Sequence, residues 1–269
     1  PWSAVNYFKH DCVPDVYWGN TSSNSVLGSL VANADNKMLK RLYALAEPGG
    51  TVNAPIDTRI VFPDLGVAPQ AVWSMLYLAG YLTTDDTALP GDTERPRALR
   101  IPNREVAKIY TSEITGRFAQ AAGGRDVLYD LHEALVAGDA EIFAEELEDV
   151  LLNCASFHDL ASENSYHMLM MGLLFNVPGY ESPVSNHEAG RGRFDIQLAP
   201  LETGRGPLIT VELKHAAAEA TPEKLSALAS DALAQIEDRA YDAAADEGGT
   251  LRWGIAASGK SVAVACERS

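Results

Sequence analysis

Two carboxylates and one ammonium group lie on two neighbouring strand-like segments. Asp195 lies in a run of alternating polar and apolar residues, and Glu212 and Lys214 lie in a second such run. Alternation with a period of two predicts half-buried strands. Residues 199–206, between the runs, contain one Pro and two Gly, which favours a hairpin connection. If the two strands pair, all three charged side chains lie on one side of one sheet.

Charged side chains on largely apolar strands are costly to bury unless they bind a partner. A divalent cation suits two carboxylates, because Mg²⁺ prefers carboxylate oxygens and retains several water molecules. A neighbouring ammonium group can then orient one of those waters. Asp195, Glu212 and Lys214 are therefore candidates for a site that binds Mg²⁺ or Mn²⁺. The alternative is a surface hairpin in which these residues form only a salt bridge.

The order Asp195, Glu212, Lys214 resembles the D-x(n)-E-x-K layout of the PD-(D/E)XK phosphodiesterases. Other stretches resemble a bacterial family in which an AAA-ATPase-like domain is followed by a PD-(D/E)XK nuclease domain. These stretches are YWGNTSSN (17–24), WSMLYLAGYL (73–82), RIPNREV (100–106), ENSYHMLMMGLL (163–174), SNHEAGRGRFDI (185–196), VELK (211–214) and GIAASGKSV (254–262). E-x-K alone is a weak motif, whereas this set in this order is specific.

This resemblance implies metal-dependent hydrolysis of DNA phosphodiester bonds. It implies that Asp195 and Glu212 hold Mg²⁺ or Mn²⁺ and that Lys214 positions the attacking water. It also implies an upstream ATPase-like domain as a partner. The chain does not begin with Met, and we expect it to be the C-terminal part of a longer protein.

Two more residues are site candidates through the same resemblance. Glu163 begins a helix ahead of the strands and matches the additional acidic residue of the superfamily's first motif, which makes it a third candidate metal ligand. The alternative is that Glu163 only complements the helix dipole. Gln235 lies on the inward side of a long helix, where a buried amide needs partners. Resemblance to the Q-containing helices of the superfamily implies that Gln235 contacts the catalytic site.

Four other residues have weaker support. Tyr241 follows Gln235 at a longer spacing than in the RecB-type motif of the superfamily. Arg191 and Arg193 suit bidentate phosphate binding, but they are equally consistent with ordinary charges at the start of a strand. His167 is a candidate either for the core or for a residue that supports the site.

The expected fold is α/β (α+β), in two parts. The sequence of residues 1–124 predicts a mainly helical module. Its order of elements is compatible with a winged-helix-like topology. Residues 125–269 predict a restriction-endonuclease-like core of one helix, three strands, one helix and two strands. The expected elements are a helix at 163–175, strands near 179–187, 192–199 and 208–214, a helix at 222–245, and strands at 250–257 and 261–266.

The formal net charge of −16 opposes a uniformly basic surface for nucleic acid. Any nucleic acid must then be held by a local basic patch or by another domain. The charge keeps a second function open, in which the domain is a catalytically silent nucleic-acid-binding or regulatory module coupled to the upstream ATPase-like domain. The three Cys residues form no CxxC pair, which favours a reducing cytoplasm. The longest apolar run, 168–175, is too short to span a membrane, so we expect no membrane partner.

Residues 254–261, GIAASGKS, formally fit the phosphate-binding pattern G-x-x-x-x-G-K-[ST]. That pattern requires a helix directly after it. Val262, Val264 and Cys266 instead alternate as they would in a strand. We therefore expect a hairpin turn here and no nucleotide binding by this chain.

Overall fold

The computed structural model describes residues 25–59, 69–86, 95–154, 163–216, 220–242 and 247–269, together with residues 5, 8–10, 12 and 245. Two compact units divide the chain, Pro1–Glu113 and Ile114–Ser269. The division falls inside helix α5 (Arg104–Ala122). The domain boundary between residues 124 and 125 stays a prediction. The stretch 17–24, which contributed to the family resemblance, lies outside the described residues.

The first unit combines helices with a two-stranded sheet. Its elements are α2 (Ser25–Ala32), α3 (Asn36–Ala46), β1 (Val52–Pro55), α4 (Pro69–Leu78), β2 (Pro96–Leu99) and the first part of α5. Strands β1 and β2 pair antiparallel. Helix α3 begins where the side chain of Asp35 accepts a hydrogen bond from the backbone of Met38, which is typical of an Asp at a helix N-cap. A winged-helix-like topology for this unit stays a prediction.

Helices α6 (Arg125–Ala137), α7 (Ala140–Cys154) and α8 (Glu163–Leu173) precede the strands of the second unit. Helix α6 ends at Gly138, whose φ of 80° is left-handed and favours glycine. Asp139 then caps α7, because its Oδ1 accepts a hydrogen bond from Ile142 N at 3.1 Å, as expected for such a residue. A left-handed glycine and an Asp cap therefore form the turn between α6 and α7.

A five-stranded mixed sheet forms the centre of the second unit, in the order β3-β6-β7-β8-β9. Its strands are β3 (Val184–Ser185), β6 (Ile196–Leu198), β7 (Leu208–His215), β8 (Thr250–Ser258) and β9 (Ser261–Arg268). β7 and β8 are parallel and are joined through helix α9 (Pro222–Arg239), whereas the other neighbours are antiparallel. The predicted order of one helix, three strands, one helix and two strands is confirmed as α8, β3-β6-β7, α9 and β8-β9.

Some predicted strand bounds were wrong. The strand expected near 179–187 is reduced to β3 and an isolated bridge between Tyr180 and Pro200. The strand expected at 192–199 is interrupted before β6, because the amide of Leu213 that would continue the ladder bonds to the Asp195 side chain instead. A separate hairpin, β4 (Glu188–Ala189) with β5 (Gly192–Arg193), therefore lies outside the main sheet.

The long helix also ends earlier than expected. Helix α9 stops at Arg239 rather than at 245, because Ala240 takes a left-handed conformation with a φ of 53°. Its start was predicted correctly, since Thr221 caps it and Pro222 occupies the first turn. The early stop turns the chain back toward the sheet at Tyr241, which is buried.

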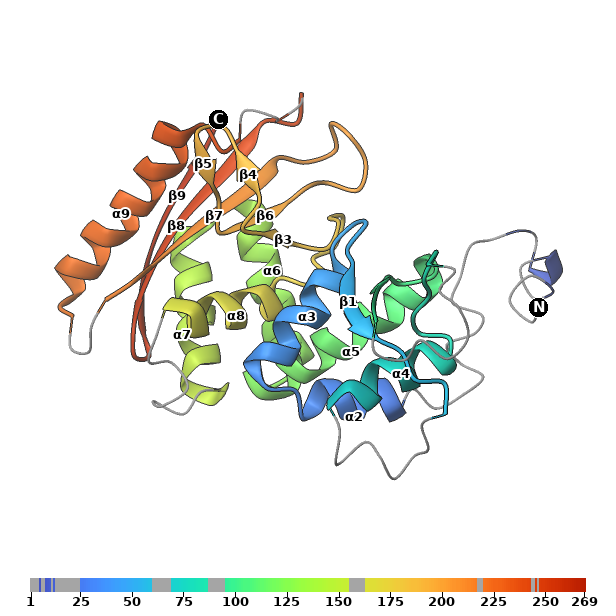
Figure 1. The fold of residues 1–269 in the computed structure, drawn as a ribbon. Coiled ribbons are helices and arrows are strands. Elements are labelled where there is room, and N and C mark those ends of the chain that lie inside the picture. Colours follow the sequence, from blue (N-terminus) through green and yellow to red (C-terminus); the bar gives the residue numbers. More distant parts are fainter. Residues whose placement is uncertain are drawn as a thin grey trace. The chain divides into compact units, whose positions relative to one another are not determined.

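Strand β7 is buried on both faces along most of its length, whereas its alternation predicted a half-buried strand. Helix α9 packs on β7, β8 and β9, and α7 and α8 lie on the other side of the sheet (Figure 1). Gly254 permits a close approach by α9, because a Cβ at this position would lie 2.1 Å from Ala229 O. The polar residues of β7 on the α9 side are therefore enclosed between strand and helix.

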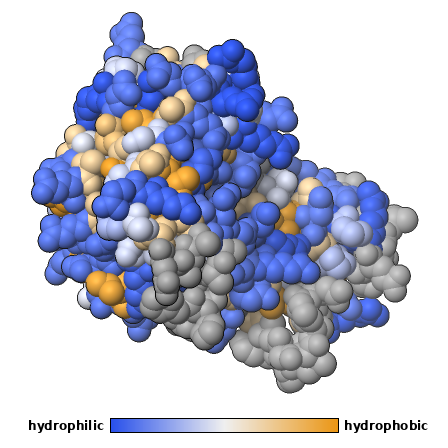
Figure 2. Space-filling view, turned by 90° about the vertical axis from the view of Figure 1, so that its left-hand side faces the viewer, coloured by the Kyte–Doolittle hydropathy of each residue, from blue (hydrophilic) through white to orange (hydrophobic). Residues whose placement is uncertain are grey.

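The surface on the α9 side of the molecule is mostly hydrophilic, with a small apolar patch (Figure 2). Near α9, Leu228, Ala263 and Ala265 are partly buried and pack against a small core cluster. Among the residues that the structure describes, no helix is both long enough and apolar enough to cross a membrane.

Candidate functional site

Asp195 and Glu212 are brought together by the pairing of β6 with β7. The register joins Ile196 to Val211, so the next position along the strands places Asp195 opposite Glu212. Opposed residues on antiparallel strands have Cβ atoms roughly 4.5–5.5 Å apart. After burial, the charge of Asp195 is the next cause that raises the pKa of Glu212. Two carboxylates thus lie at one level of the sheet, on neighbouring strands.

Glu212 is enclosed, with a side chain that is only 4% exposed. Burial, followed by the charge of Asp195, raises the pKa of Glu212 to about 7, although Lys214 opposes the change. Gly254 is the neighbour of Glu212 in the parallel register of β7 and β8. Because the backbone of α9 lies directly over that glycine, it closes this flank of the carboxylate to water.

One oxygen of Glu212 has no donor. Its Oε2 atom is buried and lacks a hydrogen-bond partner among the residues that the structure describes. A buried carboxylate oxygen without a partner is costly, and such atoms in native proteins usually indicate an ion, a water or a functional role. The Oε2 position is therefore suited to binding a cation.

Gln235 links helix α9 to both charged residues of β7. Its Oε1 accepts a hydrogen bond from Lys214 Nζ at 2.6 Å, and its Nε2 donates to Glu212 Oε1. Lys214 Nζ also lies 3.3 Å from Glu212 Oε1. The three side chains form a closed triangle, so the position of the ammonium group depends on the amide of Gln235.

Tyr241 and Gln197 extend this network along the sheet. The hydroxyl of Tyr241 lies 3.3 Å from Gln235 Nε2. Gln197 Nε2 donates to Thr210 Oγ1 at 3.0 Å and to the carbonyl oxygen of Tyr241 at 3.2 Å. Spacing along a helix did not predict the Tyr241 contact, because Tyr241 lies beyond the end of α9 and reaches Gln235 through the turn at Ala240.

Asp195 is held through both its side chain and its backbone. Its Oδ2 accepts a hydrogen bond from Leu213 N at 2.8 Å, and its carbonyl oxygen lies 3.2 Å from His167 Nε2. Burial raises the pKa of Asp195, while the Leu213 amide, His167 and Lys214 oppose the change. His167 therefore contacts the backbone that carries Asp195 and supports the site from helix α8.

Glu163 is separate from the two strand carboxylates. It begins α8 and is exposed, although its charge adds a smaller effect to the burial that raises the pKa of Asp195. Within the part of the chain that the structure describes, no three His, Cys, Asp or Glu side chains are grouped so that they could hold a metal ion. The structure thus brings Asp195 and Glu212 together but does not add Glu163 to form a three-carboxylate centre. The role of Glu163 as a metal ligand stays a prediction.

The two arginines of the β4–β5 hairpin have different surroundings. Arg191 donates from its side chain to Asp238 O at 2.7 Å and from its backbone to Arg239 O at 2.8 Å, so it is tied to the end of α9. Arg193 pairs with Glu188 at 3.6 Å, and both side chains are largely exposed. Exposed pairs contribute only about 0–1 kcal/mol, so Arg193 can exchange Glu188 for another anion at little cost.

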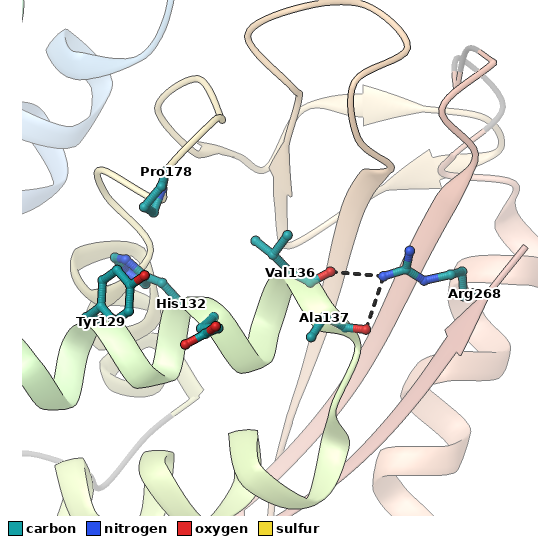
Figure 3. Close-up of a pocket in the computed structure, with 7 residues that line it drawn as sticks. Tyr129, His132, Val136, Ala137, Pro178 and Arg268 are labelled. Carbon is teal, nitrogen blue, oxygen red and sulfur yellow. Dashed lines mark hydrogen bonds between the residues drawn. The ribbon is translucent and has the colours of Figure 1, made fainter.

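A separate pocket of about 540 Å³ lies along α6 (Figure 3) and is lined by Tyr129, His132, Glu133, Val136, Ala137, Pro178 and Arg268. The Nη2 of Arg268 donates to the carbonyl oxygens of Val136 and Ala137 at 2.9 and 3.1 Å. These bonds satisfy the C-terminal end of α6. None of the site residues predicted from the sequence lines this pocket.

Gly254 contributes to the site without having been singled out for it. In the sequence it is the first glycine of GIAASGKS, and the relevant signal is a glycine inside a strand pattern, which often indicates close approach by another backbone. The strand predicted after Lys260 is confirmed, because Ser258 pairs with Ser261 and β9 follows. Lys260 Nζ donates to Leu152 O at 2.9 Å, at the end of α7.

Comparison with protein-family models finds a match over residues 161–267, to the PD-(D/E)XK nuclease superfamily. No curated protein and no solved structure matches the chain. The matched range covers α8, α9 and the five-stranded sheet as far as residue 267. It includes Glu163, Asp195, Glu212, Lys214 and Gln235. Residues 161–267 therefore carry a PD-(D/E)XK nuclease superfamily domain.

Proposed function

We propose that this domain is a metal-dependent nuclease that hydrolyses DNA phosphodiester bonds. The observation that carries the proposal is Glu212 Oε2, a buried carboxylate oxygen without a hydrogen-bond partner in the described residues. It lies on the strand that carries Lys214 and at the level of Asp195. Burial of an unpaired carboxylate oxygen in an apolar core is costly, whereas in a hydrolytic site the same oxygen can bind a metal ion.

The residues present fit Mg²⁺ or Mn²⁺. Asp195 and Glu212 would hold the cation, and two protein carboxylates are sufficient for Mg²⁺, which retains much of its water shell. When bound, such a cation polarises the scissile phosphate and lowers the pKa of a coordinated water. Glu163, at the start of α8, is proposed as the additional acidic residue, which acts on the site from further away.

The other residues of the triangle orient the reaction. Lys214 would orient the attacking water and stabilise the negative charge that develops on the phosphate. Gln235 holds Lys214 by accepting its hydrogen bond. The long side chain of Lys214 is therefore already ordered before the reaction and loses less conformational freedom during it. His167 and Leu213 keep Asp195 in place through its carbonyl oxygen and its carboxylate.

Two observations favour a second candidate function, a catalytically silent module that binds nucleic acid. No group of three metal-binding side chains is formed within the described residues, and the Lys214 ammonium group is held by internal partners. In either case, the resemblance to proteins with a preceding AAA-ATPase-like domain leads us to propose that such a domain is the partner of this chain.

Cleavage of labelled DNA in the presence of Mg²⁺ or Mn²⁺ tests the proposal. We expect strand scission that EDTA abolishes and that Lys214→Ala reduces by at least about 100-fold, the loss typical of a group that stabilises a transition state. Lys224→Ala, at an exposed position in α9, is the matched control and should cleave like the wild type. Binding of DNA with no scission under any metal would instead favour the silent module.

A further inference from the structure

A polar pocket of about 590 Å³ lies beside the candidate active site. Its lining comprises Gly192, Arg193, Asp231, Ala234, Gln235, Asp238, Arg239 and Tyr241. Five of these residues follow one another on α9 at positions i, i+3, i+4, i+7 and i+8, the spacing of one helix face. The remaining residues come from β5 and from the turn after α9, so the pocket lies between helix and hairpin.

Gln235 belongs both to the pocket and to the site. The same side chain that lines the pocket accepts the hydrogen bond of Lys214 and donates to Glu212. Tyr241, on the pocket wall, lies 3.3 Å from the amide of Gln235. A molecule in the pocket would therefore lie next to the residues that we propose act on the phosphate.

The hairpin wall of the pocket is fixed to the end of α9. Gly190, with a φ of 54°, allows this contact, because a Cβ there would lie 2.1 Å from Arg239 O. Arg191 adds the two hydrogen bonds to Asp238 O and Arg239 O. Gly192 has no side chain, and a Cβ there would lie 3.0 Å from the Tyr241 hydroxyl. The hairpin side of the pocket is thus held in place before a ligand binds. The pocket remains open at Gly192 because this residue has no side chain.

The chemistry of the lining matches a nucleotide. Arg193 and Arg239 supply guanidinium groups, which suit phosphate oxygens, whereas Asp231 and Asp238 supply acceptors, which suit the exocyclic amino groups of bases. The hydroxyl of Tyr241, which accepts a hydrogen bond from Gln235 Nε2, can donate its own hydrogen to a ligand. With two groups of each sign, the pocket selects a ligand that carries both donors and an anion, rather than an anion alone.

We propose that this pocket holds one unpaired nucleotide of the strand that is cleaved, beside the scissile phosphate, and that the substrate is a nucleic acid with a single-stranded segment. This proposal rests on the proposed nuclease function for its position in the reaction. The volume falls within the roughly 300–1,000 Å³ of small-ligand pockets. A base inside a duplex can enter such a pocket only by leaving its stack, which costs a few kcal/mol, whereas an unpaired base enters without that cost.

Binding without catalysis separates the pocket from the chemistry. Fluorescence anisotropy with a labelled single-stranded 12-mer, and with the same sequence as a blunt duplex, is measured in EDTA so that no cleavage occurs. We expect the single strand to bind at least about 10-fold more tightly, as the cost of unstacking a base implies. Arg239→Gln and Arg193→Gln should each weaken single-strand binding about 10-fold and reduce the salt slope by roughly 1.

Two further variants control for changes in folding and in net charge. Arg205→Gln removes one arginine from an exposed pair with Glu202, remote in sequence from the pocket, and should bind the single strand like the wild type. Asp231→Asn changes an exposed residue of α9, so it tests base recognition without removing a cation. We expect it to change the order of affinity among homopolymer 12-mers, and unchanged melting temperatures show that the variants fold.

The outcomes for the pocket and for the enzyme differ. Equal affinity for single strand and duplex would contradict the proposed nucleotide pocket. An equal loss of single-strand affinity in Arg205→Gln and Arg239→Gln would also contradict it. Preferential single-strand binding that Arg239→Gln removes, with no cleavage under any metal, supports the pocket and rejects the nuclease. Cleavage of the duplex interior that Arg239→Gln leaves unchanged supports the nuclease and rejects the pocket.

Discussion

The ammonium group of Lys214 lies 2.6 Å from the side-chain oxygen of Gln235, so a lysine of the central strand is held by an amide of the helix that covers it. The same amide donates to Glu212 through its nitrogen. An amide can serve both charges at once because it carries a donor and an acceptor. Neither a second carboxylate nor a second lysine could do so at this position.

Removal of this amide should impair catalysis more than stability. In Gln235→Ala, Lys214 loses an acceptor, and hydrogen bonds to charged groups contribute roughly 1.5–3 kcal/mol. We expect the rate of DNA cleavage at saturating substrate to fall about 10- to 100-fold, since about 1.4 kcal/mol corresponds to tenfold. Gln120→Ala, at an exposed position near the end of α5, should keep the wild-type rate. A Gln235→Ala enzyme with full activity would show that the triangle is not used in the reaction.

The buried carboxylate of Glu212 should make the metal-free fold less stable as the pH rises. The pKa of Glu212 in the folded state, about 7, lies above the ordinary value of 4.5. The stability that the protonated side chain contributes to the fold is therefore fully present below about pH 4.5, and it is lost as the pH rises to about 7. The change corresponds to roughly 3 kcal/mol. Urea denaturation in EDTA between pH 5 and pH 8 should show this decline in the wild type.

Glu212→Gln should remove most of that pH dependence and raise the free energy of unfolding at pH 8. The amide keeps the shape of the side chain but carries no charge that burial would penalise. Glu247→Gln, at an exposed position, is the matched control and should keep the decline. The same decline in wild type and Glu212→Gln would mean that another group titrates in this range.

A divalent cation should reverse the effect of pH. Ligand that binds only the folded state stabilises it, by about 2.7 kcal/mol at a hundred times Kd. Because protons compete with the cation for Glu212, we expect Mg²⁺ or Mn²⁺ to raise the melting temperature more at pH 8 than at pH 6. Asp195→Asn should lose most of this rise, whereas Lys214→Ala should keep it. A melting temperature that millimolar Mg²⁺ and Mn²⁺ leave unchanged would contradict the metal site.

A second buried ion pair fixes the turn that carries Tyr241. Arg252 Nε lies 2.6 Å from Asp242 Oδ2, with side chains 15% and 7% exposed. Arg252→Ala leaves the Asp242 carboxylate buried and unpaired, which should cost about 3–5 kcal/mol of stability in urea denaturation. Arg205→Ala, which removes an exposed pair with Glu202, should cost less than about 1 kcal/mol. Similar losses of stability in the two variants would show that the Asp242 carboxylate becomes exposed to water once Arg252 is removed.

Local sequence patterns predicted the hairpin that carries Asp195 and Glu212, because strand alternation and turn residues act over a few positions. They also predicted the start of α9 and the inward face of Gln235. They did not predict how deeply Glu212 is buried, since that depends on Gly254, which comes from a strand beyond the crossover. They did not predict the contact of Tyr241 with Gln235, because a single left-handed residue, Ala240, brings Tyr241 back to the sheet.

The position of Glu163 relative to the strands could not be derived from spacing either. A residue at the first turn of α8 is placed by packing of the whole helix, for example by the contact of Gly172 with the ring of Phe118, where a Cβ would lie 2.1 Å from a ring carbon. Helix position is a tertiary property, which sequence periodicity does not contain. The strand residues, in contrast, share one register and move together.

The close contact of α9 with Gly254 also determines the route by which ions and water reach Glu212. The helix backbone closes the flank beside β8, and the partly exposed Lys214 lies at the open end of β7, with a side chain 29% exposed. Exchange must therefore avoid the flank beside β8 unless α9 separates from the sheet. Local separations of this kind are slow, because they break many contacts together. We expect a bound cation to leave slowly, and Gly254→Ala, which forces α9 outward, to shorten its residence time.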